Sequence, residues 1–298
     1  MKEDIHISFH EQISRNKRNS IFLILLIFAV LISLSYVIGL IYTDYFFLIL
    51  IAGIIISLSY ILIGYYNSDK IALASVGARQ ADTSQYRQLY NSVEGLCLAS
   101  GMPMPRIYIM ENEQINAFAT GRDPQHSVIC VTTGALRKLN KQELEGVLSH
   151  ELSHIANYDI RFMTLTAVLV GMIAIISEIF LRSLWYRSGN DDNKKAGLMI
   201  IGIVLAILAP IFVKLVQLAI SRKREFVADA SAVKFTRYPM GLISALKKIK
   251  GEHIDEKESK KINKAVAPLF ISNPFKKIGN LASTHPPIDK RIEILERM

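Results

Sequence analysis

The chain has 298 residues, of which 51% are apolar and only 20% are charged, and its formal net charge is +9. The apolar residues lie in long blocks, which excludes a soluble globular protein, a disordered chain and a disulfide-stabilised scaffold. The two cysteines, Cys97 and Cys130, match no metal-cysteine spacing. We expect both to be buried thiols on a reducing side of a membrane.

Two uncharged segments near the N-terminus, Ile21–Tyr42 and Tyr45–Tyr66, predict membrane-spanning helices. Each is long enough to cross a hydrocarbon core of about 30 Å. Only Thr43 and Asp44 separate the two segments, so we expect a tight transmembrane hairpin. The first segment is too long for a cleavable signal peptide, and a second span follows at once.

Two weaker apolar segments, Phe162–Leu181 and Ala196–Ile220, predict a second membrane hairpin. Glu178, Pro210 and Lys214 interrupt them, so a hairpin that enters the bilayer only partly is the alternative. The two charged side chains could be functional intramembrane groups, as in a transporter. We favour the alternative that they snorkel toward the headgroups.

The distribution of basic residues predicts the orientation in the membrane. Arg15, Lys17 and Arg18 precede the first span, and the turn after it has neither Lys nor Arg. We therefore expect both termini of a four-span chain in the cytoplasm of a cell-membrane protein. Residues 221–298 carry 17 Lys and Arg against 9 Asp and Glu, which is nearly all of the net charge. No nucleic-acid-binding motif accompanies this charge, so we expect membrane lipids, and no nucleic acid, as its partner.

These patterns predict an α+β, mostly helical domain attached to a four-helix transmembrane anchor. The predicted parts are a cytoplasmic segment (1–20), a transmembrane hairpin (21–66), a cytoplasmic part (67–159), a second membrane hairpin (160–220) and a second cytoplasmic part (221–298). The two larger cytoplasmic parts would together build one folded domain.

The first of these two parts predicts helices and short strands. Apolar spacing favours a helix over Asp82–Ser100. Arg106–Met110 and Ser127–Thr132 alternate in polarity as strands do. Asn140, with Glu143 three residues later, predicts a capping box at the start of a further helix.

That further helix carries the sequence His150-Glu151-Leu152-Ser153-His154. Residues four apart lie on one helical face, so both imidazoles can reach one metal ion. Glu151 would hold a water against the metal and accept its proton. The alternative is a helix with two incidental histidines. The chain has only seven histidines, and the regular pattern of this helix favours the metal site.

A zinc site needs a third protein ligand, and the sequence offers a distant one. A histidine six residues after His154 would give a metzincin, but that position is Ile160. Glu225 and Asp229 instead share one helical face directly after the fourth apolar segment. Glu225 is the natural ligand, and Asp229 would accept the N–H of a ligand histidine. Without the histidine motif this pair would be an ordinary polar helical face.

The chain resembles the HtpX membrane zinc endopeptidases, which are related to the CAAX prenyl proteases. The matching segments are INAFATG (115–121), HELSHIANYD (150–159), SRKREFVADA (221–230) and STHPPIDKRI (283–292). Their order and spacing match the family, as does the order of two spans, histidine motif, two spans and glutamate motif. The resemblance covers most of the chain.

The resemblance implies a gluzincin-type protease domain with one zinc ion per chain. It assigns His150, His154 and Glu225 to the zinc and Glu151 to the role of catalytic base. It also implies that the substrates are unfolded polypeptides and misfolded or damaged membrane proteins. The expected role is quality control and stress response at the cytoplasmic membrane.

Three further positions follow mainly from the resemblance. His285, before two prolines, would donate a hydrogen bond to the developing oxyanion. The alternative is a loop histidine before a turn. Asn116 would contact the substrate backbone, and a turn residue is its alternative. For Asp159 we favour a structural role at a helix end over metal binding.

The strand at Ser127–Thr132 has a predicted use in such an enzyme. The strand follows the turn residues Gly121, Asp123 and Pro124. Because a metalloprotease needs an extended substrate, we expect this strand to present an exposed edge. An open edge can bind an extended polypeptide through backbone hydrogen bonds, and such binding depends little on the side chains of the polypeptide. That property would suit a protease with broad substrates.

The function that we predict is a membrane-anchored zinc endopeptidase. One rival is a processing protease for a single lipidated or tagged substrate, although four spans cannot easily enclose a chamber. A second rival is a non-catalytic membrane scaffold that keeps zinc for structure. A structural zinc site usually has four protein ligands, and the retention of Glu151 argues for catalysis.

Overall fold

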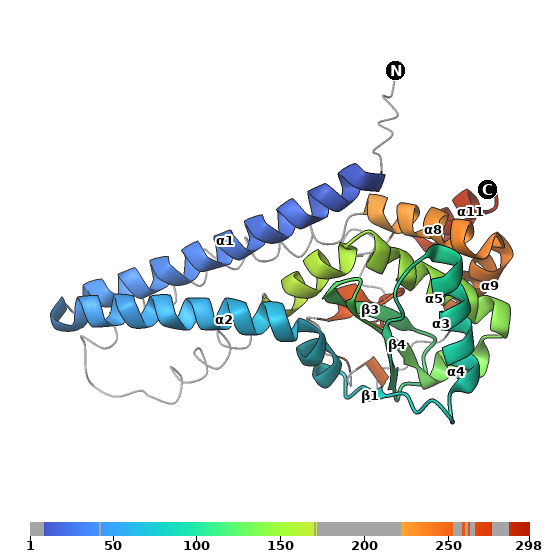
Figure 1. Cartoon of the computed structure of the whole chain (residues 1–298), viewed down its shortest axis with the longest axis horizontal. Coiled ribbons are helices and arrows are strands. Elements are labelled where there is room, and N and C mark those ends of the chain that lie inside the picture. Colours follow the sequence, from blue (N-terminus) through green and yellow to red (C-terminus); the bar gives the residue numbers. More distant parts are fainter. Residues whose placement is uncertain are drawn as a thin grey trace, which may run out of the picture.

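The computed structural model shows a long helical hairpin and a body of helices and one mixed sheet, from which the hairpin projects (Figure 1). It describes residues 9–41, 43–169, 171, 222–252, 258–259, 262, 266–275 and 286–298. The predicted third span is described only in its first part, where 159–169 are helical. Apart from residue 171, the rest of that span and the predicted fourth, with Glu178, Pro210 and Lys214, lie outside these residues.

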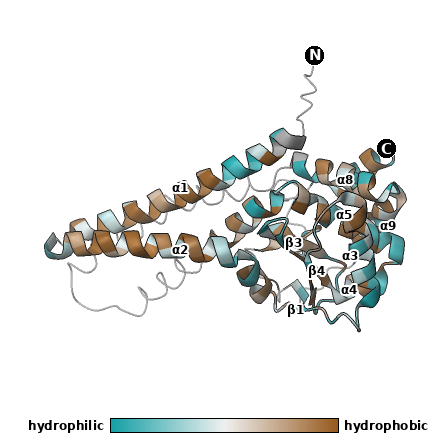
Figure 2. Cartoon of the chain, viewed as in Figure 1, coloured by the Kyte–Doolittle hydropathy of each residue, from teal (hydrophilic) through white to brown (hydrophobic). Residues whose placement is uncertain are grey.

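The hairpin consists of α1 (Phe9–Ile41), the short helix η1 (Thr43–Tyr45) and α2 (Phe46–Ser75). The two predicted apolar segments are confirmed as helices that are long and apolar enough to cross a membrane. Figure 2 shows the hydrophobic colour on both helices over most of the hairpin. Large side chains such as Phe47, which is 76% exposed, face outward, as expected of helices that lie in lipid.

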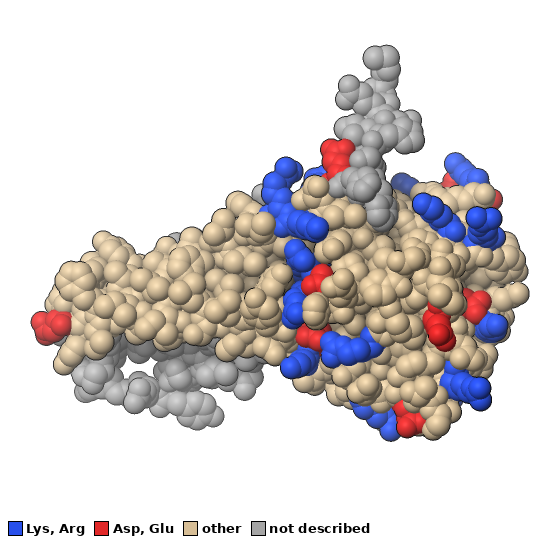
Figure 3. Space-filling view, in the orientation of Figure 1, with Lys and Arg blue, Asp and Glu red and all other residues tan. Residues whose placement is uncertain are grey.

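The uncharged part of the hairpin ends sharply where the hairpin meets the body. Residues 19–68 contain one charged side chain, Asp44, at the tip of the hairpin. On the face drawn in Figure 3 the hairpin shows no other charge, and Lys and Arg gather at its base with a few Asp and Glu among them. At the same level α2 is kinked, because Asn67 has non-helical backbone angles. The apolar surface of the hairpin therefore ends at this level.

The body contains a sheet of strands β1 (Arg79–Gln80), β2 (Arg106–Met110), β3 (Ala117–Asp123) and β4 (His126–Thr132). Their order is β1-β2-β4-β3, with β2 and β4 parallel and the other pairs antiparallel. The two predicted strands are confirmed as β2 and β4.

The prediction that the strand at Ser127–Thr132 has an open edge is wrong. β4 is paired on both sides, because β3 lies against its other edge with Ala117 opposite Val131 and Thr120 opposite Val128. The segment that forms β3 is rich in small residues and contains Gly121, so it has no clear strand pattern. Pairing with β4 makes it a strand.

Helices surround the sheet and carry most of the site. They are α3 (Arg87–Ser100), α4 (Thr133–Lys138), α5 (Lys141–Ala156), α8 (Arg222–Thr236), α9 (Pro239–Gly251), η2 (Ala267–Leu269) and α11 (Ile288–Leu295). The predicted helix at Asp82 begins later, at Arg87. The Asp82 carboxylate instead accepts the backbone N–H groups of Ser84 and Gln85 in a turn.

Helix α5 is fixed at its start and along its buried face. The predicted capping box is confirmed, since the side chains of Asn140 and Glu143 each accept the other's backbone N–H. Gly146 lies against α9 so closely that a Cβ there would come within 2.5 Å of the backbone nitrogen of Leu242. Apolar side chains of α5, α9 and the sheet share one core, and the two cysteines are buried and unbonded as predicted.

Candidate active site

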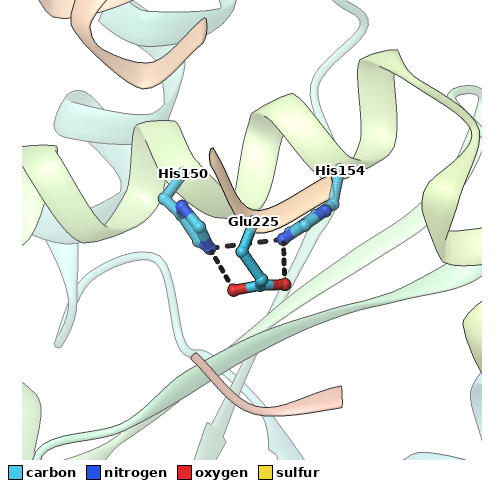
Figure 4. A group of neighbouring side chains, drawn as sticks. All are labelled: His150, His154 and Glu225. Atoms are coloured by element: carbon cyan, nitrogen blue, oxygen red, sulfur yellow. Dashed lines mark hydrogen bonds and ion pairs between the residues drawn. The ribbon is translucent and has the colours of Figure 1, made fainter. Parts of the chain in front are cut away.

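The two histidines of the predicted motif lie side by side on the buried face of α5 (Figure 4). His150 is completely buried and His154 is 5% exposed. Because they are four residues apart, their rings project in the same direction, and their Nε2 atoms are 3.2 Å from each other. The helix therefore presents two nitrogen ligands to one point.

Glu225 reaches the same point from α8, in a part of the chain far away in sequence. Its Oε2 lies 3.7 Å from Nε2 of His150, and its Oε1 lies 3.6 Å from Nε2 of His154. Metal–ligand bonds of about 2.0–2.1 Å in a tetrahedral site place ligand atoms roughly 3.3 Å apart. The observed separations are close to that value, so these three residues fit a metal ion such as zinc.

Glu151 stands next to this cluster on α5. It is 1% exposed, and neither carboxylate oxygen has a hydrogen-bond partner within the residues that the structure describes. Burial raises the pKa of Glu151, and the charge of Glu225 raises it further, whereas His150 and His154 lower it. A carboxylate with a raised pKa and free acceptor oxygens is suited to accept a proton.

Asp229, one turn after Glu225 on α8, contacts the outer nitrogen of His150. Its Oδ1 is 3.0 Å from Nδ1 of His150, the contact that the sequence predicted. Sequence reasoning missed its other partner, Arg291 of α11. The Arg291 guanidinium donates to both oxygens of Asp229, at 2.9 and 2.7 Å, and is 1% exposed. A signal for it existed, because a buried carboxylate requires a countercharge.

The charges in this group hold each other in place. Although burial opposes ionisation, Arg291 and His150 lower the pKa of Asp229 to about 2. Burial and the Arg291 charge oppose a charged His150, but hydrogen bonds to Asp229 and Glu225 outweigh them and raise the pKa of His150 to about 9. The ring therefore favours a bound cation, either a proton or a metal ion.

His154 has an equivalent support on its own outer nitrogen. Oδ2 of Asp159 lies 3.0 Å from Nδ1 of His154, which agrees with the predicted structural role of Asp159. Asn16, on α1, donates to Oδ1 of Asp159 at 2.6 Å and to the carbonyl of Asn157 at 3.0 Å. Arg224 lies 3.6 Å from the same carboxylate. No sequence pattern indicated a role for Asn16, which lies between two basic residues ahead of the first span.

The two remaining predicted residues have different positions. Asn116 directly precedes β3 and is 3% exposed. Its amide donates to the carbonyl of Ser272 and accepts the N–H of Ser272 and of Ala117, so it ties a later segment to β3. Substrate contact by Asn116 stays a prediction. His285 lies outside the described residues, and its role also stays a prediction.

Comparisons with known proteins agree with this geometry. Residues 83–298 match peptidase family M48. The chain is 44% identical over 296 residues to a protease HtpX homolog of Dictyoglomus turgidum, which covers 98% of this chain and 95% of the relative. It is 47% identical over 242 residues to the homolog of Caldanaerobacter subterraneus, covering 79% and 80%, and 41% identical over 297 residues to that of Streptococcus gordonii, covering 97% and 99%.

A solved structure shares the fold. The crystal structure of S. mikatae Ste24p superposes with a TM-score of 0.50 at 18% sequence identity, over 96% of this chain and 67% of the other. The histidine pair, the buried glutamates and the apolar hairpin thus define a membrane-associated metalloprotease. The chain belongs to peptidase family M48 and, within it, to the HtpX proteases, which confirms the resemblance seen in the sequence.

Proposed function

We propose that the protein is a zinc endopeptidase in which His150, His154 and Glu225 hold one zinc ion. The observation that carries this proposal is the spacing of the three ligand atoms, all within 4.8 Å of one another and beside a buried Glu151. Two imidazole nitrogens and one carboxylate oxygen are a common donor set of catalytic zinc, and they leave one position open. When bound, zinc would supply a Lewis acid that lowers the pKa of a water in the site.

Glu151 moves the proton in this proposal. Its carboxylate accepts the proton of the attacking water and later delivers it to the leaving amine. Both oxygens lack a hydrogen-bond donor among the described residues, so no internal bond has to break before the proton moves. The raised pKa of Glu151 makes its carboxylate a stronger base, which favours proton transfer from the water.

Asp229 and Asp159 fix the two histidines in the tautomer that metal binding requires. Each carboxylate faces an Nδ1 atom, so each ring carries its proton on Nδ1 and turns Nε2 toward Glu225. Arg291 keeps Asp229 ionised and oriented. Such supports are typical of metal sites, and their loss weakens metal binding even though they do not touch the metal.

The extended substrate lies along β3 in this proposal. β3 is the outer strand of the sheet on the side of α5, and the backbone N–H of Ala119 lies near the Glu151 carboxylate and lowers its pKa without forming a hydrogen bond. The start of the strand is already bridged, because Phe118 pairs with Phe270 and Ile271 donates to the carbonyl of Ala117. His285 would donate to the oxyanion and Asn116 would help to place the peptide.

The substrates that we propose are unfolded polypeptides and misfolded or damaged membrane proteins, cut on the cytoplasmic side. Arg15, Lys17 and Arg18 lie where α1 leaves its apolar stretch, and the positive-inside rule assigns such an end to the cytoplasm. Asn16 connects this end of α1 to Asp159 beside the site. The active centre would therefore work within reach of the membrane surface, in quality control and stress response.

The test compares wild-type protein, Glu151→Gln and Glu145→Gln in detergent, with zinc added after chelator treatment and casein as substrate. We expect Glu151→Gln to lose about 10²–10⁴-fold in rate while still binding about one zinc per chain. Glu145 lies on the same helix and bonds Ser92 instead, so Glu145→Gln should behave as wild type. Full activity of Glu151→Gln would refute the proposed base, and inactive wild type that binds zinc would favour the scaffold alternative.

A further inference from the structure

A hollow of about 400 Å³ lies at the base of the hairpin, away from the histidine pair. It is bordered by the kinked part of α2 and by the ends of β2, β3 and β4 that meet it. The residues that matter for its chemistry are Tyr65, Tyr66, Lys70, Arg106, Arg122 and His126. Its volume is within the range of small-molecule sites.

The hollow is positively charged. Lys70, Arg106 and Arg122 line it, and Asp69 is the one carboxylate in its lining. Arg106 bonds Asp69 through one nitrogen but remains 45% exposed at its side chain, so further N–H groups face water. Lys70 forms no ion pair with any residue that the structure describes.

Arg122 is held in a fixed position at the edge of the hollow. Its guanidinium lies 5.3 Å from the ring centre of Tyr66 and 3.5 Å from Asp123, and its carbonyl accepts a hydrogen bond of 2.6 Å from Arg161. The Asp123 carboxylate also bonds His126 at 2.8 Å, so its charge is shared between two partners. The surroundings therefore leave an excess of positive charge in the hollow.

The hollow opens at the level where the apolar surface of the hairpin ends. Tyr66 borders it, and Ile63 and Leu62, three and four residues earlier on α2, are 51% and 54% exposed. Residues at this spacing share one helical face, so an exposed apolar strip leads from the hollow along α2 toward the hairpin tip. Figure 3 shows the uncharged hairpin surface meeting a group of Lys and Arg at this level.

We propose that this hollow binds the phosphate headgroup of an anionic glycerophospholipid, with the acyl chains lying along the exposed face of α2. A phosphodiester accepts bidentate bonds from arginine and a point-charge contact from lysine, and both kinds of donor are present. Tyrosines at the headgroup level are typical of the membrane interface. The site is separate from the proposed zinc centre, so its test does not depend on catalysis.

The excess positive charge determines which lipid fits. Phosphatidylglycerol brings one uncompensated negative charge, whereas phosphatidylcholine also brings a cation close to Lys70 and the arginines. Inorganic phosphate could use the same donors but would gain nothing from the apolar strip on α2. Lipid and free phosphate are therefore distinguishable by their relative affinities.

The experiment titrates the delipidated full-length protein in detergent with short-chain phosphatidylglycerol, phosphatidylcholine or inorganic phosphate, and follows binding by calorimetry. We expect phosphatidylglycerol to bind at least about tenfold more tightly than phosphatidylcholine. Lys70→Gln and Arg106→Gln should each weaken phosphatidylglycerol binding by about fivefold or more, because each removes a charge-assisted bond.

Two matched variants remove the same charges elsewhere. Arg79 lies on β1 of the same sheet and pairs with Glu111, and Lys247 of α9 pairs with Glu296, so Arg79→Gln and Lys247→Gln should bind as wild type. Arg106→Gln leaves Asp69 without its partner, and therefore Lys70→Gln tests the site without that loss. Equal binding of both lipids, or equal effects of Lys70→Gln and Lys247→Gln, would overturn the proposal. Displacement of phosphatidylglycerol by an equal concentration of phosphate would overturn the lipid assignment.

Discussion

The hairpin and the body turn the same kinds of apolar residue in opposite directions. In α1 and α2 large side chains such as Phe47 face outward, whereas in the sheet Ile129 is completely buried. Outward-facing apolar side chains are favourable in lipid, whereas a domain surrounded by water buries them. Only the body can therefore enclose ionised groups, and it does so in pairs such as Arg291 with Asp229.

The contrast also identifies where the two regions meet. The polar contact at Asn16 joins the membrane helix α1 to Asp159, which in turn contacts His154. A helix that served only as an anchor would not need this contact. The hairpin therefore contributes to the geometry of the proposed metal centre, and the division between anchor and catalytic domain is not complete.

The strongest test of the body's polar interior is Arg291→Met. It leaves Asp229 buried without its countercharge, and breaking a buried pair costs about 3–5 kcal/mol. Arg297→Met, just beyond the same helix, breaks an exposed pair with Glu293 and should change stability little. Thermal unfolding in detergent measures both. Equal melting temperatures for the two variants would show that the buried pair does not support the body.

Asn16→Ala tests whether the hairpin supports the metal centre. Loss of an outer hydrogen bond to a ligand typically weakens metal affinity about 10–100-fold, and we expect a value near the lower end because Asn16 acts through Asp159. Zinc competition against a chelator measures the affinity. Asn19→Ala, one turn further along α1, is the matched control. Unchanged zinc affinity in Asn16→Ala would show that the hairpin serves only as a membrane anchor.

Close helix contacts should have different consequences in the two regions. Gly146→Ala forces a methyl against α9 and should destabilise the body by about 1–3 kcal/mol. Gly53→Ala would overlap Ser35 on α1 and should disturb only the hairpin, leaving zinc affinity unchanged. Gly95→Ala, on the open side of α3, should stabilise slightly. A melting temperature of Gly146→Ala at or above that of Gly95→Ala would contradict this packing.

A pH dependence of the stability of the metal-free body is also expected. The pKa of His150 is about 9 in the folded protein and about 6.5 when unfolded. Because the folded value is higher, protonated His150 stabilises the fold fully below about pH 6.5, and this contribution is lost as pH rises through about 9. The melting temperature of wild type should therefore fall more between these values than that of His150→Gln. Parallel curves would refute the assignment.

Local patterns in the sequence were sufficient for the parts of the site that one helix builds. The capping box at Asn140 and the histidine pair depend on spacing within α5, and both are confirmed in position. The approach of Glu225 and Asp229 was predicted from the chemistry that a two-histidine site requires. These inferences succeeded because each needs only helical periodicity or a ligand count.

Features that depend on distant partners were missed. β3 lacks strand residues of its own, and pairing with β4 determines its structure. The helical turns of α1 before Ile21 are polar, and Asn16 has meaning only beside Asp159. Arg291 lies in the segment STHPPIDKRI (283–292), but nothing local in the sequence showed that it would be fully buried against Asp229. Tertiary context decided each of these positions.

The division of the site between α5 and α8 has a consequence for biosynthesis. The ribosome completes α5 first, and Glu225 follows His154 by 71 residues. At about 5–20 residues per second, several seconds pass before the proposed third ligand exists. During that time the two histidines lack Glu225, so the growing chain does not yet contain the complete proposed centre.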